Sequence, residues 1–285
     1  MIIDIYITIV AFILGASVGS FLNALCERVY NHEPFVIARS VCRSCNKELS
    51  VLDLIPFFSF LFLRGKCRYC KAKLPMDLFL SEIILGVLFS LSYFVARPLI
   101  LTDMTMFYLY WGFLLFNISF FFFIALYDFK YYIIPDLAVY GLSMIYIIII
   151  IDIFVLNKTG LHVLYYADVT SFMIQHFITA IALLIFFLSI YLVTQGRGLG
   201  GGDVKLVFLI GLLLGAKPSI VFLYVAFFSG ALVSILLLVV KTKQLKDAIP
   251  FGPFLAFGVI IAILYSGVLL STPLFSFVNY LGAIV

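Results

Sequence analysis

The sequence predicts an all-α polytopic membrane protein with about eight transmembrane helices and one polar, cysteine-containing loop between the first two. Of the 285 residues, 65% are hydrophobic and only 11% are charged, whereas soluble domains carry about 25% charged residues. Apolar runs recur along the chain at lengths near the roughly 20 residues that cross a bilayer. The one long polar interval, residues 26–77, holds all five cysteines. We therefore expect a first transmembrane helix (1–25), a cysteine domain (26–77) and a transmembrane domain (78–285).

Eight apolar segments are the predicted membrane helices. The first, 2–25, has no basic leading region and no small-residue cleavage site, so we expect a retained helix rather than a signal peptide. The sixth, 204–214, is bounded by Asp203 and by Lys217-Pro218 and is short for a full span. We expect it to be tilted or partly buried in protein. The others cover residues 78–96, 106–126, 133–156, 171–193, 219–240 and 254–271.

The placement of Lys and Arg predicts the orientation of these helices. With eight spans and both termini outside, 15 of the 18 Lys and Arg residues fall on one side. Because positively charged short loops stay in the cytoplasm, the cysteine loop, Asp128 and Asp203 are expected at the cytoplasmic face. The net charge of +4 then reflects topology beside anionic lipid, and we expect no nucleic-acid partner.

The cysteine loop contains two C-x-x-C pairs, Cys42 with Cys45 and Cys67 with Cys70, separated by 21 residues. Such pairs can place four thiolates tetrahedrally around Zn²⁺. A loop without a sizeable hydrophobic core needs a cross-link such as a bound metal ion to fold. Disulfides are disfavoured in the cytoplasm, so structural zinc is the preferred interpretation. An unmetallated thiol loop and a redox-active dithiol remain alternatives. Cys26 is a further thiol without an assigned role.

A short apolar run, residues 54–63, lies between the two cysteine pairs and is followed by Arg64, Gly65 and Lys66. The run is too short to span a bilayer. Two interpretations remain open: the run lies on the membrane surface as an interfacial segment, or it forms the buried core of the cysteine domain.

Asp203 follows a glycine-rich run and directly precedes an apolar helix. A lone Asp in this position would be explained as an N-cap, because its carboxylate accepts the free amide hydrogens of the first turn. A cap does not need the preceding Gly200, Gly201 and Gly202, whereas a substrate backbone that approaches the carboxylate closely does need residues without side chains. We interpret Asp203 as a catalytic acid and the three glycines as substrate-binding residues.

Asp128 lies at the C-terminal end of the third apolar segment, where the helix dipole disfavours a negative charge. This unfavourable position indicates a functional role. Asp136 instead follows Pro135 at the start of the fourth segment, where proline and an acid both stabilise a helix, so it needs no functional explanation. By the same argument Asp203, at a helix N-terminus, is expected to ionise more easily than Asp128.

Two carboxylates that share one proton near a membrane surface are the machinery of aspartic proteolysis. One alternative is a proton-coupled small membrane transporter, in which Asp128 and Asp203 relay protons. Transport gives no reason for four cysteines, and both aspartates fall near one face rather than at mid-bilayer. A thiol oxidoreductase would place the C-x-x-C pairs on the oxidising outer side, against the charge distribution.

Several sequence blocks together resemble the prepilin peptidases, or type IV leader peptidases, which are GxGD-type membrane aspartic proteases. The resemblance covers nearly the whole chain and rests on the order and spacing of the blocks. They are Gly19-Ser20-Phe21-Leu22-Asn23, the two cysteine pairs with residues 53–59 and 63–66, Ser81-Glu82, Tyr127-Asp128 through Pro135-Asp136, Gly200 through Leu206, and Phe251-Gly252-Pro253-Phe254.

The resemblance implies a bifunctional enzyme of the bacterial inner (cytoplasmic) membrane. It would remove the leader peptide of type IV prepilins or pseudopilins at the cytoplasmic face, and would then N-methylate the new N-terminus with S-adenosylmethionine. The catalytic aspartates of the family correspond to Asp128 and Asp203, which assigns residues 78–285 to the protease. Residues 26–77 would be the methyltransferase part, with a zinc-type site at its four cysteines and cofactor contacts at Gly65 and Lys66.

Overall fold

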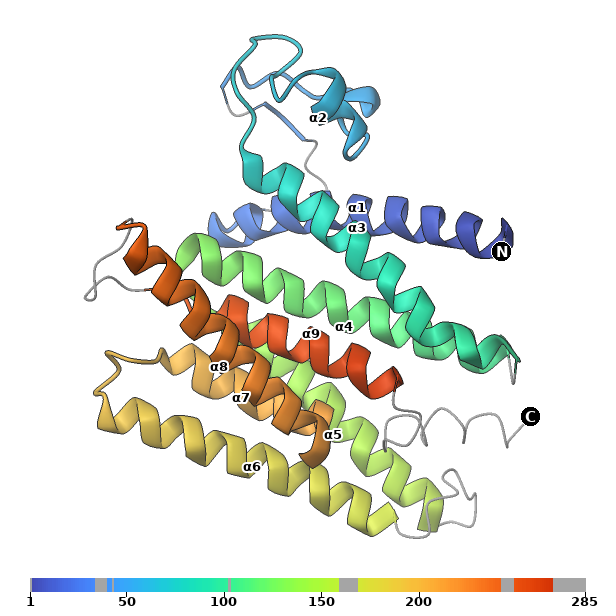
Figure 1. Cartoon of the computed structure of the whole chain (residues 1–285), viewed down its shortest axis with the longest axis vertical. Helices are drawn as coiled ribbons and strands as arrows, with labels where there is room; N and C mark the ends of the chain where they lie inside the picture. Colours follow the sequence, from blue (N-terminus) through green and yellow to red (C-terminus); the bar gives the residue numbers. More distant parts are fainter. Residues whose placement is uncertain are drawn as a thin grey trace. The chain divides into compact units, whose positions relative to one another are not determined.

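The computed structural model describes residues 2–33, 40–42, 44–101, 104–158, 169–241 and 249–268 (Figure 1). Within these ranges the regular structure is helical, and the only extended pairing is two isolated bridges in the cysteine loop. The predicted all-α fold is confirmed. The elements are α1 (Ile2–Tyr30), η1 (Val51–Asp53), α2 (Phe58–Phe62), α3 (Met76–Ala96), η2 (Arg97–Leu101), α4 (Met104–Tyr131), α5 (Asp136–Lys158), α6 (Val169–Val193), α7 (Gly201–Leu214), α8 (Ala216–Val239) and α9 (Gly252–Val268).

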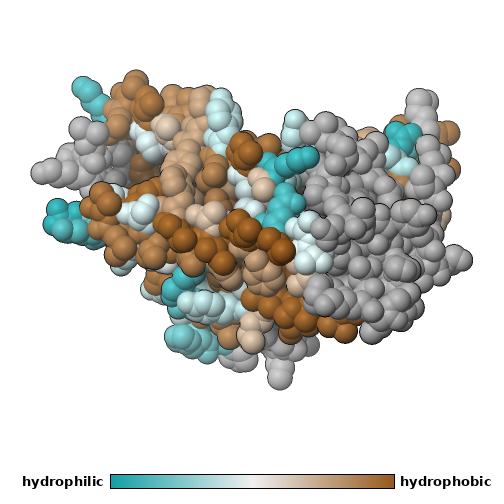
Figure 2. Space-filling view, turned by 90° about the horizontal axis from the view of Figure 1, so that it is seen from below, coloured by the Kyte–Doolittle hydropathy of each residue, from teal (hydrophilic) through white to brown (hydrophobic). Residues whose placement is uncertain are grey.

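The eight longer helices of the described residues correspond to the eight predicted apolar segments. Five of them, α1, α3, α4, α6 and α8, are long and apolar enough to cross a membrane. The end of the last predicted segment, 269–271, lies outside the described residues. Figure 2 shows hydrophobic residues over much of one face of the molecule. Because large apolar surfaces are not stable in water, the chain is a multi-pass membrane protein.

The chain divides into two compact units. The first comprises Met1–Phe94 and Leu115–Phe123, and the second comprises Val95–Leu114 and Ile124–Val285. In the first unit, α1 and α3 pack very closely: a Cβ added to Gly19 would lie 2.5 Å from the carbonyl oxygen of Ser81. Small residues of this kind let membrane helices approach each other backbone to backbone.

In the second unit, α7 is the central helix. It packs against α5, α6, α8 and α9, and almost all of its residues from Asp203 to Leu214 are buried. Its 14 residues are too few to cross a bilayer at about 1.5 Å per residue. The expectation that this segment is partly buried in protein is confirmed.

The cysteine loop belongs to the first unit and connects α1 to α3 (Figure 1). Its longest helix among the described residues is α2, which covers the end of the apolar run predicted to be either interfacial or a buried core. No residue of α2 is buried. The buried-core interpretation of α2 is therefore wrong.

Candidate active site and metal centre

Asp128 occupies the last turn of α4, and its side chain is buried, with 6% exposed. Its Oδ2 accepts a hydrogen bond of 2.9 Å from the backbone N–H of Gly252. Gly252 is the first residue of α9, so the carboxylate lies at a second helix terminus, where unpaired amides and the helix dipole stabilise negative charge. The N-terminus of α9 therefore offsets the unfavourable effect that the C-terminus of α4 has on a negative charge at Asp128.

Asp203 is equally buried, with 6% exposed, and lies in the first turn of α7. The N-cap of this helix is Gly200, so the alternative that Asp203 itself is the N-cap is wrong. Asp203 is the third helical residue, and its Oδ2 accepts a hydrogen bond of 3.0 Å from the backbone N–H of Gly200. Each aspartate thus has one oxygen bound to a backbone amide at a helix N-terminus. Position at a helix N-terminus therefore does not predict which of the two aspartates ionises more easily.

The two aspartates, 75 positions apart in sequence, come together in the second unit. They are close enough for the charge of Asp128 to act on the Asp203 carboxyl group. The turn after α4 packs closely against the start of α7, since a Cβ added to Gly202 would lie 3.1 Å from the Cβ of Ile134. The structure therefore supplies two buried, neighbouring carboxyl groups, as acid/base chemistry on one substrate requires.

The three glycines before Asp203 differ in their surroundings. Gly200 and Gly201 are exposed, and a Cβ added to Gly201 would meet no atom closer than 3.9 Å. Gly202 is partly buried against Ile134. Packing alone therefore accounts for glycine at position 202 but not at position 201, where the absence of a side chain leaves the surface beside Asp203 open.

Asp136 begins α5 and forms an ion pair with Lys205 of α7, whose Nζ lies 2.9 Å from both carboxylate oxygens. Both side chains are substantially exposed. This pair connects α5 to the helix that carries Asp203, so a structural role accounts for Asp136. The contributions of Lys205 and Gly252 were not predicted, although both residues lie in the sequence blocks quoted above.

The four predicted metal ligands, Cys42, Cys45, Cys67 and Cys70, also meet. Their sulfur atoms all lie within 4.8 Å of one another, and those of Cys42 and Cys70 are 3.8 Å apart. A tetrahedron of four thiolates with Zn–S bonds of about 2.3 Å has edges of about 3.8 Å. The cluster could therefore hold a zinc ion. The fifth cysteine, Cys26, is buried in α1 and is not one of this group.

The local backbone favours the ionised form of one of these thiols, Cys42. The backbone N–H groups of Cys45 and Ser44 donate to the Cys42 thiolate and lower the pKa of Cys42 to about 6. The lowered pKa favours the thiolate of Cys42, which is the form that binds metal. At Cys70, a backbone hydrogen bond from Ala72 is outweighed by desolvation and by hydrogen bonds with the neighbouring cysteine thiols, which raise the pKa to about 11. The two C-x-x-C turns have matching geometry, because the residue after each second cysteine, Asn46 or Lys71, has a positive φ of 54° or 60°.

Gly65 and Lys66, the residues associated by resemblance with methyl transfer, lie in the turn that follows α2, after Leu63 and Arg64. Gly65 has a φ of 65°, and a Cβ there would lie 2.9 Å from the Phe60 ring. Its backbone conformation and this contact both favour glycine. Lys66 is exposed and pairs through its backbone with Lys73. The geometry thus gives Gly65 a structural role, and a cofactor role for either residue stays a prediction.

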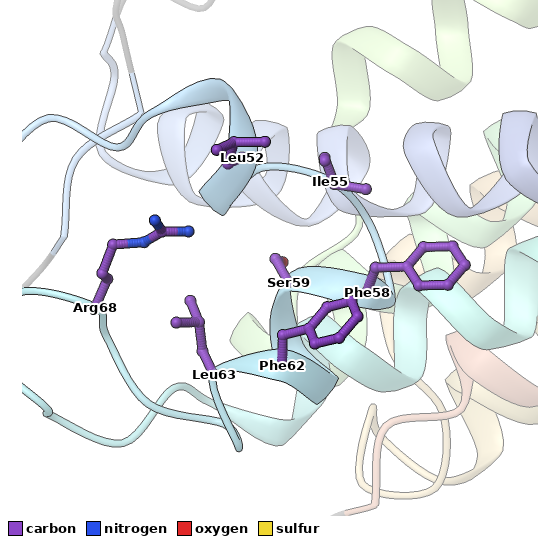
Figure 3. Close-up of a pocket in the computed structure, with 7 residues that line it drawn as sticks. All are labelled: Leu52, Ile55, Phe58, Ser59, Phe62, Leu63 and Arg68. Atoms are coloured by element: carbon purple, nitrogen blue, oxygen red, sulfur yellow. The ribbon is translucent and has the colours of Figure 1, made fainter.

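A cavity of about 240 Å³ lies in the cysteine loop beside α2 (Figure 3). Figure 3 shows the Arg68 guanidinium on the side opposite the rings of Phe58 and Phe62. Its polar lining side chains are Ser59 and Arg68, and the rest are apolar: Leu52, Ile55, Phe58, Phe62 and Leu63. This lining suits an apolar ligand or side chain better than a polar one.

Comparison with known proteins gives two family matches. The bacterial peptidase A24 N-terminal domain matches residues 13–96, and the type IV leader peptidase family matches residues 115–235. The second match contains Asp128 and Asp203, and the first contains the four clustered cysteines. No solved structure matches the chain significantly.

Curated proteins that are similar to this chain are described as leader peptidases. A prepilin leader peptidase/N-methyltransferase of Bacillus subtilis is 27% identical over 92% of this chain and 96% of its own length. A protein of the same description from Pseudomonas aeruginosa is 26% identical over 89% of this chain and 88% of its own length. Another, from Vibrio cholerae, is 29% identical over 74% of this chain and 79% of its own length. These matches support a peptidase rather than the transporter alternative.

Proposed function

Because the chain belongs to the type IV leader peptidase family, we propose that it is a membrane aspartic endopeptidase that removes the leader peptide of type IV prepilins or pseudopilins. The observation that carries this proposal is the meeting of Asp128 and Asp203. Both lie in the segment that the family matches, both are buried, and each has Oδ2 bound to a backbone amide.

The reaction follows from this arrangement. One aspartate, in its ionised form, accepts a proton from a water molecule held between the pair, and that water attacks the scissile carbonyl carbon. The protonated partner donates its proton to the carbonyl oxygen. The first aspartate then gives the proton that it took from water to the leaving amine, and the partner recovers a proton from the intermediate as the carbonyl group reforms. The amides of Gly252 and Gly200 hold the two Oδ2 atoms in position, which leaves the Oδ1 atoms to contact water and substrate.

The glycines beside Asp203 are proposed to receive the substrate backbone. Gly200 and Gly201 are exposed next to the buried carboxyl group, so an extended peptide can approach without meeting a side chain. Gly202 contributes to this surface less directly, because it also packs against Ile134.

The second proposed activity is N-methylation of the new N-terminus, in keeping with relatives that are described as N-methyltransferases as well as peptidases. S-adenosylmethionine would supply the methyl group. Among the described residues, the cavity beside α2 offers only Arg68 and Ser59 as polar partners, which do not match the adenine, ribose and amino-acid groups of that cofactor. We assign the cavity no role in methyl transfer, and Gly65 and Lys66 keep only the role implied by resemblance.

Zinc is proposed as a structural ion. Cys42, Cys45, Cys67 and Cys70 would bind it, and the ion would connect the two C-x-x-C turns of a loop that has few buried apolar residues. We propose the division into a first membrane helix (1–25), a cysteine domain with the methyltransferase part (26–77) and a protease domain (78–285). The family resemblance supports a location in the bacterial inner membrane, and the distribution of basic residues supports an orientation with both sites facing the cytoplasm.

The direct test is cleavage of a purified prepilin by the full-length enzyme in lipid nanodiscs. Asp128→Asn and Asp203→Asn should each abolish cleavage, because one member of the acid/base pair is lost. Asp152→Asn, at an exposed position of α5, is the matched control and should cleave normally. Normal cleavage by either of the first two variants would remove that residue from the mechanism.

The methyl transfer is tested on the same product. With S-adenosylmethionine present, the mature pilin N-terminus should gain the mass of one methyl group. A mature N-terminus of identical mass with and without S-adenosylmethionine would exclude this second activity.

A further inference from the structure

The cysteine loop exposes a group of apolar side chains, which we call the α2 patch: Leu52, Leu54, Ile55, Phe58, Leu61 and Phe62. Their exposed fractions range from 40% for Ile55 to 83% for Phe62. Exposed apolar side chains gathered in this way are costly in water and indicate an interaction surface. The patch therefore needs a partner.

The position of α2 relative to α3 suggests which partner. Phe57, the residue before α2, donates its backbone N–H to the Glu82 carboxylate over 2.7 Å, and its ring stacks on Phe79 with centroids 5.8 Å apart. Phe60, within α2, stacks on the same Phe79 at 4.5 Å. Phe79 and Glu82 belong to the first two turns of α3, a helix apolar enough to span the membrane. The patch thus starts beside the first two turns of a helix that is long and apolar enough to cross the membrane.

The charges around the patch favour an anionic partner. Between residues 49 and 75 there are five cations and a single acid, Asp53. The Asp53 carboxylate is paired with Arg68 at 2.7 Å. The other four cations, Arg64, Lys66, Lys71 and Lys73, are exposed. Apolar side chains next to exposed Lys and Arg are the composition of segments that lie on anionic lipid.

The cavity beside α2 lies within the patch (Figure 3). Four members of the patch, Leu52, Ile55, Phe58 and Phe62, line this cavity together with Arg68. The guanidinium of Arg68 is already paired with Asp53, so the hollow itself offers an apolar surface, which suits part of an acyl chain.

We propose that the α2 patch docks the cysteine loop onto an anionic lipid surface. The rings of Phe58 and Phe62 and the side chain of Leu61 enter the boundary between headgroups and acyl chains. Arg64, Lys66, Lys71 and Lys73 lie among the phosphates. This docking holds the loop against the same membrane face at which α3 begins, independently of the chemistry that the enzyme performs.

The test places a fluorescent side chain in the patch of the full-length protein. The chain has a single tryptophan, Trp111, so Phe62→Trp in a Trp111→Phe background reports on position 62 alone. The protein is reconstituted in nanodiscs that contain either phosphatidylglycerol and phosphatidylcholine or phosphatidylcholine only. Lipids brominated on the acyl chains should quench the fluorescence of the introduced indole in the anionic discs, and acrylamide from the water should quench it weakly.

Two controls make the result specific. Tyr69→Trp, in the same background, lies in the second C-x-x-C turn outside the patch, and brominated lipid should quench it much less. Lys71→Glu combined with Lys73→Glu should reduce the quenching at position 62 in anionic discs to the level of neutral discs.

Three outcomes would overturn the proposal. Strong acrylamide quenching without lipid quenching would place the patch in water. Protection from both quenchers would show that a protein surface covers it, such as another part of this chain, a second copy or the pilin. Equal lipid quenching at positions 62 and 69 would show that the patch has no special role in docking.

Discussion

The backbone N–H of Gly252 donates a hydrogen bond of 2.9 Å to Oδ2 of Asp128, across 124 positions of sequence. A Cβ at position 252 would lie 2.5 Å from the same oxygen and 2.9 Å from its Cγ. Contacts that short do not occur between a real Cβ and its neighbours. The first residue of α9 must therefore be a glycine for its amide to reach the carboxylate, and α9 sets the position of Asp128.

Gly252→Ala is expected to impair proteolysis severely. The added methyl group must displace the Asp128 side chain, and a misplacement of about 1 Å in a catalytic group can cost about 100-fold in rate. The measurement is the rate of prepilin cleavage in nanodiscs. Gly141→Ala is the matched control, since a Cβ there would meet no atom within 4 Å, and it should cleave at the normal rate. Normal cleavage by Gly252→Ala would contradict the proposed role of the contact.

Gly201→Ala and Gly202→Ala are expected to separate substrate binding from packing. Gly201→Ala adds only an ordinary van der Waals contact, 3.9 Å from the Tyr191 ring, and removes a glycine from the first position of a helix, which is worth at most about 0.5–1 kcal/mol of stability. Its thermal stability should stay the same or rise, while cleavage falls because the methyl group obstructs the substrate backbone. Gly202→Ala presses on Ile134 and should lower thermal stability, at a cost of about 1 kcal/mol. Unimpaired cleavage by Gly201→Ala would argue against substrate contact at this position.

Asp136→Asn is expected to leave proteolysis largely intact. It breaks the ion pair with Lys205, but both groups are substantially exposed, and exposed pairs contribute little to stability because water and salt screen them. Cleavage rates and melting temperatures of Asp136→Asn and Lys205→Met should therefore be similar to each other and close to those of the unaltered protein. A complete loss of cleavage in Asp136→Asn alone would place Asp136 rather than Asp128 in the catalytic pair.

Cys42→Ser is expected to remove the bound metal, while Cys26→Ser should retain it. Elemental analysis of the purified protein should find about one zinc ion per chain in the unaltered protein, as four thiolates in a closed site require. Cys26 is buried in α1 and serves as the matched control for loss of a thiol. A Cys42→Ser variant with unchanged zinc content would rule out the cluster as the metal site.

Much of the fold could be predicted from local sequence features. Most of the eight longer helices of the described residues follow from apolar runs that match the thickness of a bilayer, and the short α7 was expected because polar residues bound it on both sides. The cysteine cluster was also predictable, since a C-x-x-C pair brings its two thiols together within a single turn. In these cases the determining interactions lie within a few residues or depend only on the solvent.

The surroundings of the aspartates could not be predicted in the same way. From the sequence, Asp128 has only the unfavourable C-terminus of its own helix, and the opposing N-terminus of α9 comes from residues more than a hundred positions away. Similarly, the sequence explains Gly202 only as part of a substrate-binding run, and the structure adds the contact with Ile134. Helices in a bilayer are apolar on both their lipid-facing and their protein-facing sides, so hydrophobic periodicity carries little information about which helices meet.

The sequence by itself therefore determined the helices, the four candidate metal-binding cysteines and the two candidate acids, because chain-local patterns and the thickness of the lipid layer decide these features. Only the tertiary structure decided that the amides of Gly252 and Gly200 hold the acids, that Asp136 pairs with Lys205, and that α2 is exposed rather than buried. Each of these depends on the packing of distant segments, whose geometry is set by close contacts among side chains and backbones rather than by any local pattern.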